Sequence, residues 1–383
     1  MKKIILILLG IVILLPNIKA ETLELAPNAK SAILMEASTG EIIYHKDMHA
    51  KYAPASMTKI MSMLLIIEAI ENDNLKWNER LKISSNAASM GGSQIFLQTN
   101  EIMSVEDLFK GVAIASANDA TVALAERIGG TEEHFVKMMN EKVAELGLKN
   151  TNFKNSSGLD EANHYSTAYD MAIISKELVK HKEVLKYTSI YEDYLRQDKD
   201  EKFWLVNTNK LVRFYEGVDG LKTGYTDEAG YCLTATAVRN NMRLIAVVFG
   251  EADSKVRNAE ISKMLDYGYN VYSIEKLLSS DSVIGKIRVI KGKDKYVEIM
   301  PIEDVNVLHK KQATKKQVTY DIKIDNYEAP LIKGERIGQI DVKEDGGIVR
   351  SIGVTVKKDI KKANIFELYL RYLLDIVRGD IDL

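Results

Sequence analysis

The sequence predicts an α+β fold: an antiparallel sheet flanked by helices, then a small all-β domain and a terminal amphipathic helix. Three patterns favour this fold. Strand-like stretches lie at both ends of the segment from Ala29 to Tyr269, with apolar helical stretches between them. From about residue 282 to residue 356, short stretches alternate apolar and polar residues between Gly and Pro, as strands do. The final stretch is a mostly apolar helix with one narrow polar stripe.

The first twenty residues have the order of a secretory signal peptide. Two lysines precede an apolar run from Ile4 to Leu15, and Ala20 offers a small residue for cleavage, although Ile18 is less suitable there. The run is shorter than the roughly 20 residues that span a bilayer. We therefore expect residues 1–20 to be a signal peptide and the protein to be exported, to the outer face of the cytoplasmic membrane, the periplasm or the cell wall.

Length and charge limit the classes of function. The 383 residues suffice for two domains, and the net charge of −2 does not favour a nucleic-acid partner, which usually binds a basic surface. Cys232 is the only cysteine and is expected to be a buried, unreactive thiol. The histidines lack the H-E-x-x-H spacing of zinc peptidases, so neither a metal nor a cofactor is expected.

Turn and cap residues mark the ends of the elements expected in the first domain. The sequences STG (38–40) and RNN (239–241) predict turns between paired strands, and Gly129-Gly130 predicts a helix end. The expected elements are strands Ser31–Glu36 and Glu41–His45, helices Ser56–Glu71, Val105–Ala115, Asp119–Ile128, Glu132–Leu146 and Ala168–Val179, strands Tyr231–Val238 and Met242–Phe249, and a helix from about Ser254 to Tyr269.

After the signal peptide, we divide the chain into a helix-and-sheet domain (21–277), a β-sandwich-like domain (278–360) and a terminal helix (361–383). In that helix Glu367, Arg371, Asp375 and Arg378 recur every three or four positions, and the remaining residues are mostly apolar. Such a helix can dock on the protein or lie in a membrane interface, and we favour the membrane surface as its partner. Because the helix is not basic, its attraction to anionic lipids is expected to be weak.

The segment PASMTKIMSMLLIIEAIEN (54–72) places Ser56 and Lys59 three apart, on one face of a helix start. Free N–H groups at a helix start favour a nearby anion, and an apolar helix body can bury the lysine and lower its pKa. A neutral lysine beside a serine hydroxyl can act as its general base. The alternative is an exposed first turn, and S-x-x-K alone is weak evidence because Ser273 to Lys276 also fits it.

Two further motifs follow. In IASANDAT, Ser116 and Asn118 lie in a break between two apolar helices, where they could simply cap the next helix. In GVDGLKTGYT, Lys222, Thr223 and Gly224 lie at the start of the sheet strands, where glycine lets a substrate backbone approach. The alternative is an exposed strand end with a solvated lysine. A P-loop is excluded because the Gly-Lys pair is absent.

Ser-x-x-Lys, Ser-x-Asn and Lys-Thr-Gly in this order resemble the motif set of serine penicillin-binding proteins and the related β-lactamases. The stretches GGSQIFL (91–97) and SSGLDEANHYSTAYDMA (156–172), with the β domain and terminal helix, resemble the D-alanyl-D-alanine carboxypeptidases among low-molecular-mass penicillin-binding proteins. The resemblance implies a penicillin-binding, β-lactamase-like transpeptidase domain. It also implies removal of the terminal D-alanine from peptidoglycan stem peptides ending in D-Ala-D-Ala, and covalent binding of β-lactam antibiotics.

The resemblance also implies a role for each motif residue. Ser56 would be the acylated nucleophile, Lys59 its base and Ser116 a proton relay, and the backbone N–H groups of Ser56 and Tyr225 would form the oxyanion hole. His164 lies in a matching stretch and is expected to be structural. The implied substrate-binding residues are Asn118, Lys222, Thr223, Gly224, Tyr225 and Arg257.

Two alternatives remain open from the sequence. A β-lactamase shares all three motifs, but class A enzymes add a glutamate that activates water. We find no Glu-x-x-Leu-Asn stretch of that kind between Asn118 and Lys222. A catalytically inactive wall-binding relative is the other alternative, and the intact motif residues argue against it.

Overall fold

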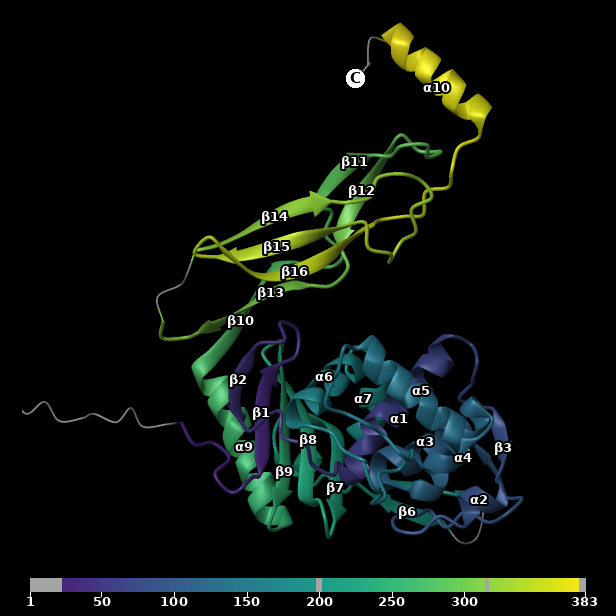
Figure 1. Cartoon of the computed structure of the whole chain (residues 1–383), viewed down its shortest axis with the longest axis vertical. Coiled ribbons are helices and arrows are strands. Elements are labelled where there is room, and N and C mark those ends of the chain that lie inside the picture. The colour runs from purple at the N-terminus through teal and green to yellow at the C-terminus, as the bar shows by residue number, and fades with distance from the viewer. Residues whose placement is uncertain (1–22, 198–201, 314–316, 379–383) are drawn as a thin grey trace, which may run out of the picture.

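The computed structural model describes residues 23–197, 202–313 and 317–378, so the expected signal peptide lies outside the described residues. A helix-rich domain with a five-stranded sheet is followed by a β domain and by one helix at the far end of the molecule (Figure 1). This arrangement confirms the α+β architecture predicted from the sequence.

The sheet of the first domain is antiparallel and is built from both ends of the domain. Its strand order is β2-β1-β9-β8-β7, so β1 pairs with β9 across the middle of the sheet. Asn240 and Asn241 adopt φ angles of 49° and 62° in the turn between β8 and β9, a conformation that Asn tolerates. The strands are β1 (Ser31–Glu36), β2 (Ile42–Lys46), β7 (Val218–Thr226), β8 (Gly230–Arg239) and β9 (Met242–Glu251).

Helices cover both faces of this sheet, with α9 on one side and α1, α4 and α6 on the other (Figure 1). Successive residues of β1 alternate between the two cores: Leu34 faces the α9 side, and Ile33 and Met35 face the other helices. The helical elements are the 3-10 turn η1 (Ala55–Thr58), α1 (Lys59–Glu71), α2 (Ser85–Ala88), α3 (Val105–Lys110), the π-helical η2 (Gly111–Ala115), α4 (Asn118–Gly129), α5 (Glu132–Glu145), α6 (Ala168–Leu178), α7 (Lys182–Thr188), α8 (Leu211–Phe214) and α9 (Ser254–Val271).

The second domain has a five-stranded sheet, β11-β12-β16-β15-β14, and a two-stranded sheet, β10-β13, that share one apolar core. Because β10 follows α9 directly and pairs with β13, we propose that the domain junction lies at Tyr272. Among the described residues, no helix has the length and apolar character needed to cross a membrane. The elements are β10 (Tyr272–Leu278), β11 (Gly285–Arg288), β12 (Tyr296–Pro301), β13 (Val305–Lys310), β14 (Val318–Ile324), β15 (Gly338–Glu344), β16 (Gly347–Val356) and α10 (Ile365–Arg378).

Some elements differ from the expectation. The helix expected over 105–115 is α-helical only to Lys110 and continues as η2, where Gly111 packs against Ile95 and Ala120. The helix expected from Ser56 begins as a 3-10 turn. Two short strand pairs were not predicted, β3 (Arg80–Lys82) with β4 (Ile102–Ser104) and β5 (Glu192–Leu195) with β6 (Phe203–Val206), and neither were β10 and β13. The strands β3 to β6, with three or four residues each, give too little alternation to detect. That reason does not apply to β10 and β13, which have seven and six residues.

Candidate active site

Ser56 and Lys59 meet where η1 passes into α1. Lys59 Nζ lies 2.9 Å from Ser56 Oγ. Ala55 has a φ of 46°, and the 3-10 turn that begins there leaves Ser56 partly exposed while Lys59 is fully buried. Ser273 and Lys276 lie instead on the strand β10, where residues three apart face opposite sides. The fold therefore brings the first S-x-x-K pair together and separates the second.

The surroundings of Lys59 favour the neutral amine. Its Nζ also donates to Asn118 Oδ1 at 2.7 Å and to Ser157 O at 2.6 Å. Burial lowers the pKa of Lys59 well below its ordinary value and the charge of Lys222 lowers it further, whereas Asp119 acts in the opposite direction. A neutral amine keeps two N–H donors for Asn118 and Ser157 and leaves its lone pair for the Ser56 proton. This geometry suits a general base.

The loop from Asn155 to Gly158 packs against η1, the 3-10 turn that carries Ser56 and that we call the nucleophile turn. No pattern in the sequence predicted this role. Asn155 Oδ1 accepts a hydrogen bond from Gly158 N at 2.7 Å, and this turn presents Ser157 O to Lys59. Gly158 has a φ of 88°, and a Cβ there would lie 1.9 Å from Ala55 O. Only glycine fits such a close approach to the residue before the nucleophile.

The predicted break lies between η2 and α4: Ser116 follows η2 directly, and Asn118 is the first residue of α4. Ser116 ends the π-helical turn with a φ of 66°, and both residues are buried. The Asn118 amide is used at both ends, because Oδ1 accepts from Lys59 and Nδ2 donates to Gly91 O at 2.7 Å. Asn118 is therefore more than a helix cap: it orients the lysine, and its backbone N–H, donating to Ser93 O at 2.7 Å, ties α4 to the loop at residues 91–93.

Lys222, Thr223 and Gly224 lie in the middle of β7, the edge strand of the sheet, rather than at its start. Lys222 is fully buried, which contradicts the alternative of a solvated lysine. Its pKa is lowered from 10.5 to about 7 by burial and by the charge of Arg257. A Cβ on Gly224 would lie 2.8 Å from Pro54 O, so this glycine lets β7 pass close to η1. The expected reason, space for a substrate backbone, is replaced by packing within the protein.

Thr208 joins the β7 motif, although no pattern in the sequence marks it. Its Oγ1 accepts from Thr223 Oγ1 at 2.8 Å and from Lys222 Nζ at 3.4 Å. Arg257 lies on α9, is 5% exposed and donates from Nε and Nη2 to Asn258 Oδ1. Tyr225 is 52% exposed beside these residues. Together they form a cationic, hydroxyl-lined site suited to a carboxylate.

His164, for which a structural role is predicted, contacts the 3-10 turn that carries Ser56. Its Nε2 lies 2.8 Å from Thr58 Oγ1, and Lys154 N donates to its Nδ1 at 3.2 Å. Because Nδ1 is an acceptor, the ring proton is on Nε2, which donates to Thr58. Burial lowers the pKa of His164 to about 4, so the ring is neutral near pH 7.

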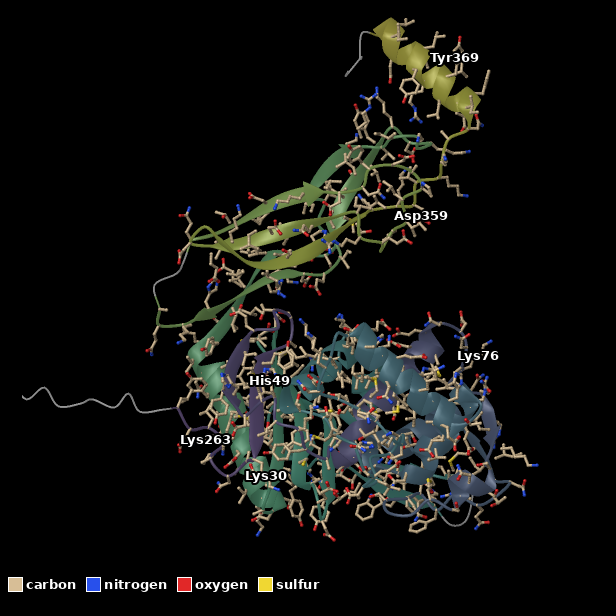
Figure 2. All side chains as sticks on the ribbon, in the orientation of Figure 1. Lys30, His49, Lys76, Lys263, Asp359 and Tyr369 are labelled. Atoms are coloured by element: carbon tan, nitrogen blue, oxygen red, sulfur yellow. The ribbon has the colours of Figure 1, made fainter. Side chains whose placement is uncertain are left out.

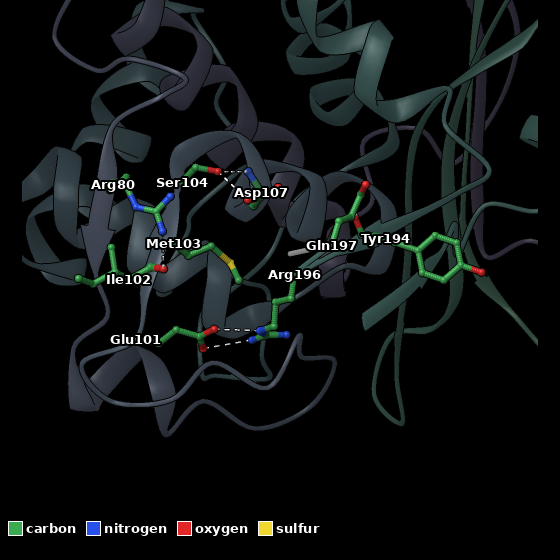
Figure 3. A pocket seen from close by; sticks show the side chains of 9 residues that line it. All are labelled: Arg80, Glu101, Ile102, Met103, Ser104, Asp107, Tyr194, Arg196 and Gln197. Carbon is green, nitrogen blue, oxygen red and sulfur yellow. Dashed lines mark hydrogen bonds and ion pairs between the residues drawn. The ribbon is translucent and has the colours of Figure 1, made fainter. Parts of the chain in front are cut away.

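A separate hollow lies between the β3–β4 pair and β5 (Figure 3). Glu101 and Arg196 face each other in it and are joined by two hydrogen bonds of 2.8 and 3.1 Å. None of the motif residues lines this hollow. In the described part of the chain, no group of three or more His, Cys, Asp or Glu side chains is arranged to hold a metal ion.

Comparison with known proteins agrees with this geometry. Residues 18–253 match the family model for D-alanyl-D-alanine carboxypeptidase, and residues 272–362 match that for the penicillin-binding protein 5 C-terminal domain. D-alanyl-D-alanine carboxypeptidase DacF of Bacillus subtilis is 51% identical over 92% of this chain and 91% of its own. Penicillin-binding protein 5 of Haemophilus influenzae superposes with a TM-score of 0.70 at 34% identity, over 88% of this chain and 98% of that one. Ampicillin-bound penicillin-binding protein D2 of Listeria monocytogenes matches 63% of this chain and 98% of its own, with a TM-score of 0.57 at 34% identity.

Proposed function

Because the chain belongs to the D-alanyl-D-alanine carboxypeptidase family, we propose that it removes the terminal D-alanine from peptidoglycan pentapeptides through an acyl-enzyme on Ser56. The chain is a serine-type carboxypeptidase, and thus a hydrolase. One observation carries the assignment of the nucleophile: a buried lysine with a lowered pKa has its Nζ 2.9 Å from Ser56 Oγ. Loss of the terminal D-alanine would limit cross-linking of the stem peptides.

Acylation begins when neutral Lys59 accepts the Ser56 proton and Oγ attacks the carbonyl carbon of the penultimate D-alanine. The oxyanion is stabilised by the backbone N–H groups of Ser56 and Tyr225, and one such donor is typically worth about 10²–10³ in rate. Ser116 relays the proton to the amide nitrogen, and free D-alanine leaves. Water then attacks the ester and restores Ser56, with Ser116 again relaying the proton.

Substrate binding uses the remaining residues. Lys222, Thr223 and Arg257 would hold the terminal carboxylate, supported by the cationic, hydroxyl-lined surroundings described above. Asn118 would contact the peptide amide while keeping Lys59 in place. β-Lactams would acylate the same serine, as the ampicillin complex of the Listeria relative suggests by analogy. The relatives are named carboxypeptidases, so neither the β-lactamase nor the inactive relative is taken further.

The test compares the wild type with Ser56→Ala and, as a matched control, Ser273→Ala in the separated S-x-x-K pair. Intact mass is followed over time with benzylpenicillin, and release of D-alanine is measured from a peptide ending in D-Ala-D-Ala. We expect a lasting adduct and D-alanine release in the wild type and the control, and neither in Ser56→Ala. An adduct on Ser56→Ala would place the nucleophile elsewhere, and rapid drug hydrolysis without an adduct would indicate a β-lactamase.

We also propose that the protein is exported and acts at the outer face of the cytoplasmic membrane, with α10 lying on the membrane surface. The support is the basic and apolar order of residues 1–20, together with the exposed apolar residues of α10. Ile365 and Phe366, for example, are 87% and 69% exposed. Fractionation of cells that produce the full chain, beside a variant truncated after Ala363, tests this: the truncated form should be released with its activity intact.

A further inference from the structure

Arg257 is a buried cation with no ion pair to a carboxylate in the described part of the chain. It lies near the start of α9, which runs along the outer side of the first domain, where Lys263 projects from it (Figure 2). The Arg257 Nε donates to Asn258 Oδ1 at 3.1 Å, and Nη2 donates to the same oxygen at 3.0 Å. A buried charge without a charged partner is costly, so this position favours an anionic ligand.

Arg243, on the strand β9, shows how a guanidinium is held when its charge is cancelled. Its Nη1 donates to Asp219 Oδ1 and its Nη2 to Asp219 Oδ2, each at 2.8 Å, so one carboxylate neutralises it. At Arg257 the amide of Asn258 takes the place of that carboxylate. Because an amide oxygen accepts hydrogen bonds without carrying a full charge, Asn258 holds the guanidinium and leaves its positive charge in place.

The acidic groups that interact with the charge of Arg257 are the Cys232 thiol, the Tyr231 phenol and the Glu251 carboxyl. Burial raises the pKa of Cys232 to about 12. Burial and the neighbouring Glu260 raise the pKa of Glu251 to about 8. At pH 7 both Cys232 and Glu251 are therefore mostly protonated, and neither cancels the charge of Arg257.

The contact between Arg257 and Asn258 also fixes the direction of the guanidinium. Successive side chains on a helix do not normally face each other, so Arg257 must turn its long side chain toward its neighbour to make both hydrogen bonds. Two donors on one oxygen hold the plane of the group. The third nitrogen, Nη1, has no hydrogen bond within the described residues and is left for a ligand. Arg257 also lowers the pKa of Lys222, so the two cations lie within electrostatic range of each other.

We propose that Asn258 is a positioning residue for the terminal carboxylate of the substrate: it fixes the Arg257 guanidinium through a neutral acceptor and so keeps its charge for that carboxylate. Asn258 acts through Arg257 and does not itself touch the substrate. The chemistry gives the site a specificity, because a substrate whose leaving group carries a carboxylate gains an interaction that an uncharged leaving group lacks. This inference rests on the proposed carboxylate-binding role of Arg257.

The test compares the hydrolysis of two esters at pH 7 by the full chain. One is a peptide ending in D-Ala-D-lactate, and the other is the same peptide as its D-alanine ethyl ester, which lacks only the carboxylate. Asn258→Asp keeps the acceptor but adds a negative charge, whereas Asn258→Ala removes the acceptor and adds no charge. Asn270→Asp is the matched control, because it adds the same charge at an exposed position about 18 Å further along α9, beyond the Debye length in physiological salt.

We expect Asn258→Asp to raise the KM for the lactate ester by about 10- to 100-fold, the usual worth of a hydrogen bond to a charged group. Its kcat should change much less, because the carboxylate is bound alike in the ground state and the transition state. The ratio of kcat/KM for the lactate ester to that for the ethyl ester should fall by a similar factor. Asn258→Ala should show a smaller fall, since the charge of Arg257 remains, and Asn270→Asp should match the wild type.

A purely structural role for Asn258 would give the opposite order, because aspartate keeps both hydrogen bonds and alanine loses them. A wild-type ratio in Asn258→Asp, or a larger fall in Asn258→Ala than in Asn258→Asp, would therefore overturn the proposal. Arg257→Gln separates this inference from the proposed function. If it raises the KM for the lactate ester while Asn258→Asp does not, only the role of Asn258 is wrong. If Arg257→Gln leaves that KM unchanged, the carboxylate-binding role of Arg257 is wrong, and the inference that rests on it is wrong too.

Discussion

Replacing Gly158 with alanine tests whether the loop after Asn155 holds the nucleophile turn. The added Cβ would lie 1.9 Å from Ala55 O, at a φ of 88°. A left-handed alanine costs about 1–2 kcal/mol, and overpacking against a well-packed core adds about 1–3 kcal/mol. We expect the free energy of unfolding to fall by about 2–5 kcal/mol. Acylation of Ser56 should slow at least about tenfold, because the displaced carbonyl belongs to the preceding residue.

Gly147→Ala is the matched control, since Gly147 has a φ of 69° and nothing within 4 Å of the added Cβ. Its free energy of unfolding should fall by only about 1–2 kcal/mol, the cost of a left-handed alanine, and it should be acylated at the wild-type rate. Denaturant unfolding gives the stabilities, and the growth of the benzylpenicillin adduct by mass gives the rates. Equal stability losses in the two variants, or unchanged acylation in Gly158→Ala, would refute the close-approach argument.

Three further predictions concern buried titratable groups. His164→Phe should slow acylation because it removes the hydrogen bond to Thr58. The dependence of the acylation rate on pH from about pH 5 to 8 should keep its shape, because the pKa of His164 is already about 4. A changed pH dependence would show that the imidazole takes part in proton transfer. Burial and then Glu260 raise the pKa of Glu251 from 4.5 to about 8, so wild-type stability is lost as pH rises through that window. The melting temperature of Glu251→Gln, relative to that of the wild type, should rise between about pH 4.5 and pH 8. A difference in melting temperature that stays constant over this range would contradict the raised pKa of Glu251. Burial and Arg257 lower the pKa of Lys222 from 10.5 to about 7, so wild-type stability is lost as pH falls through that window. Lys222→Met should be inactive, yet its melting temperature should exceed that of the wild type at about pH 6. A lower melting temperature there would show that the folded protein does not disfavour the charged form of Lys222.

Spacing along the chain predicted the parts of the site that depend on local structure. Ser56 and Lys59 share a helix face because they are three apart, and Ser116 and Asn118 share a helix break. Thr208 gave no such signal, because it meets Lys222 only after β7 folds back beside it. The strands with clear alternation were likewise predicted, whereas β3–β4 and β5–β6, with three or four residues each, were not.

Gly224 shows a limit on what the sequence alone can predict about the neighbours of a glycine. The sequence indicated that Gly224 lets a substrate backbone approach closely, but a single sequence cannot say what approaches it. The structure puts Pro54 O where a Cβ would be, so the constraint comes from the packing of β7 on η1. Gly158 carries the same kind of constraint in a loop without periodic structure, where nothing distinguishes it from an ordinary turn glycine.

The interactions among three basic side chains, Arg257, Lys222 and Lys59, account for the division of roles between the two lysines. Arg257 keeps its charge at all relevant pH values and lowers the pKa of Lys222, and Lys222 in turn lowers that of Lys59. Each step acts on a fully buried amine, and burial itself lowers the pKa of both lysines. A carboxylate bound near Lys222 would favour the charged form of that lysine, which keeps Lys59 neutral while substrate is present. Two chemically identical side chains can therefore serve as base and as anion partner, because Arg257 acts on Lys222 whereas Lys222 and Asp119 act on Lys59.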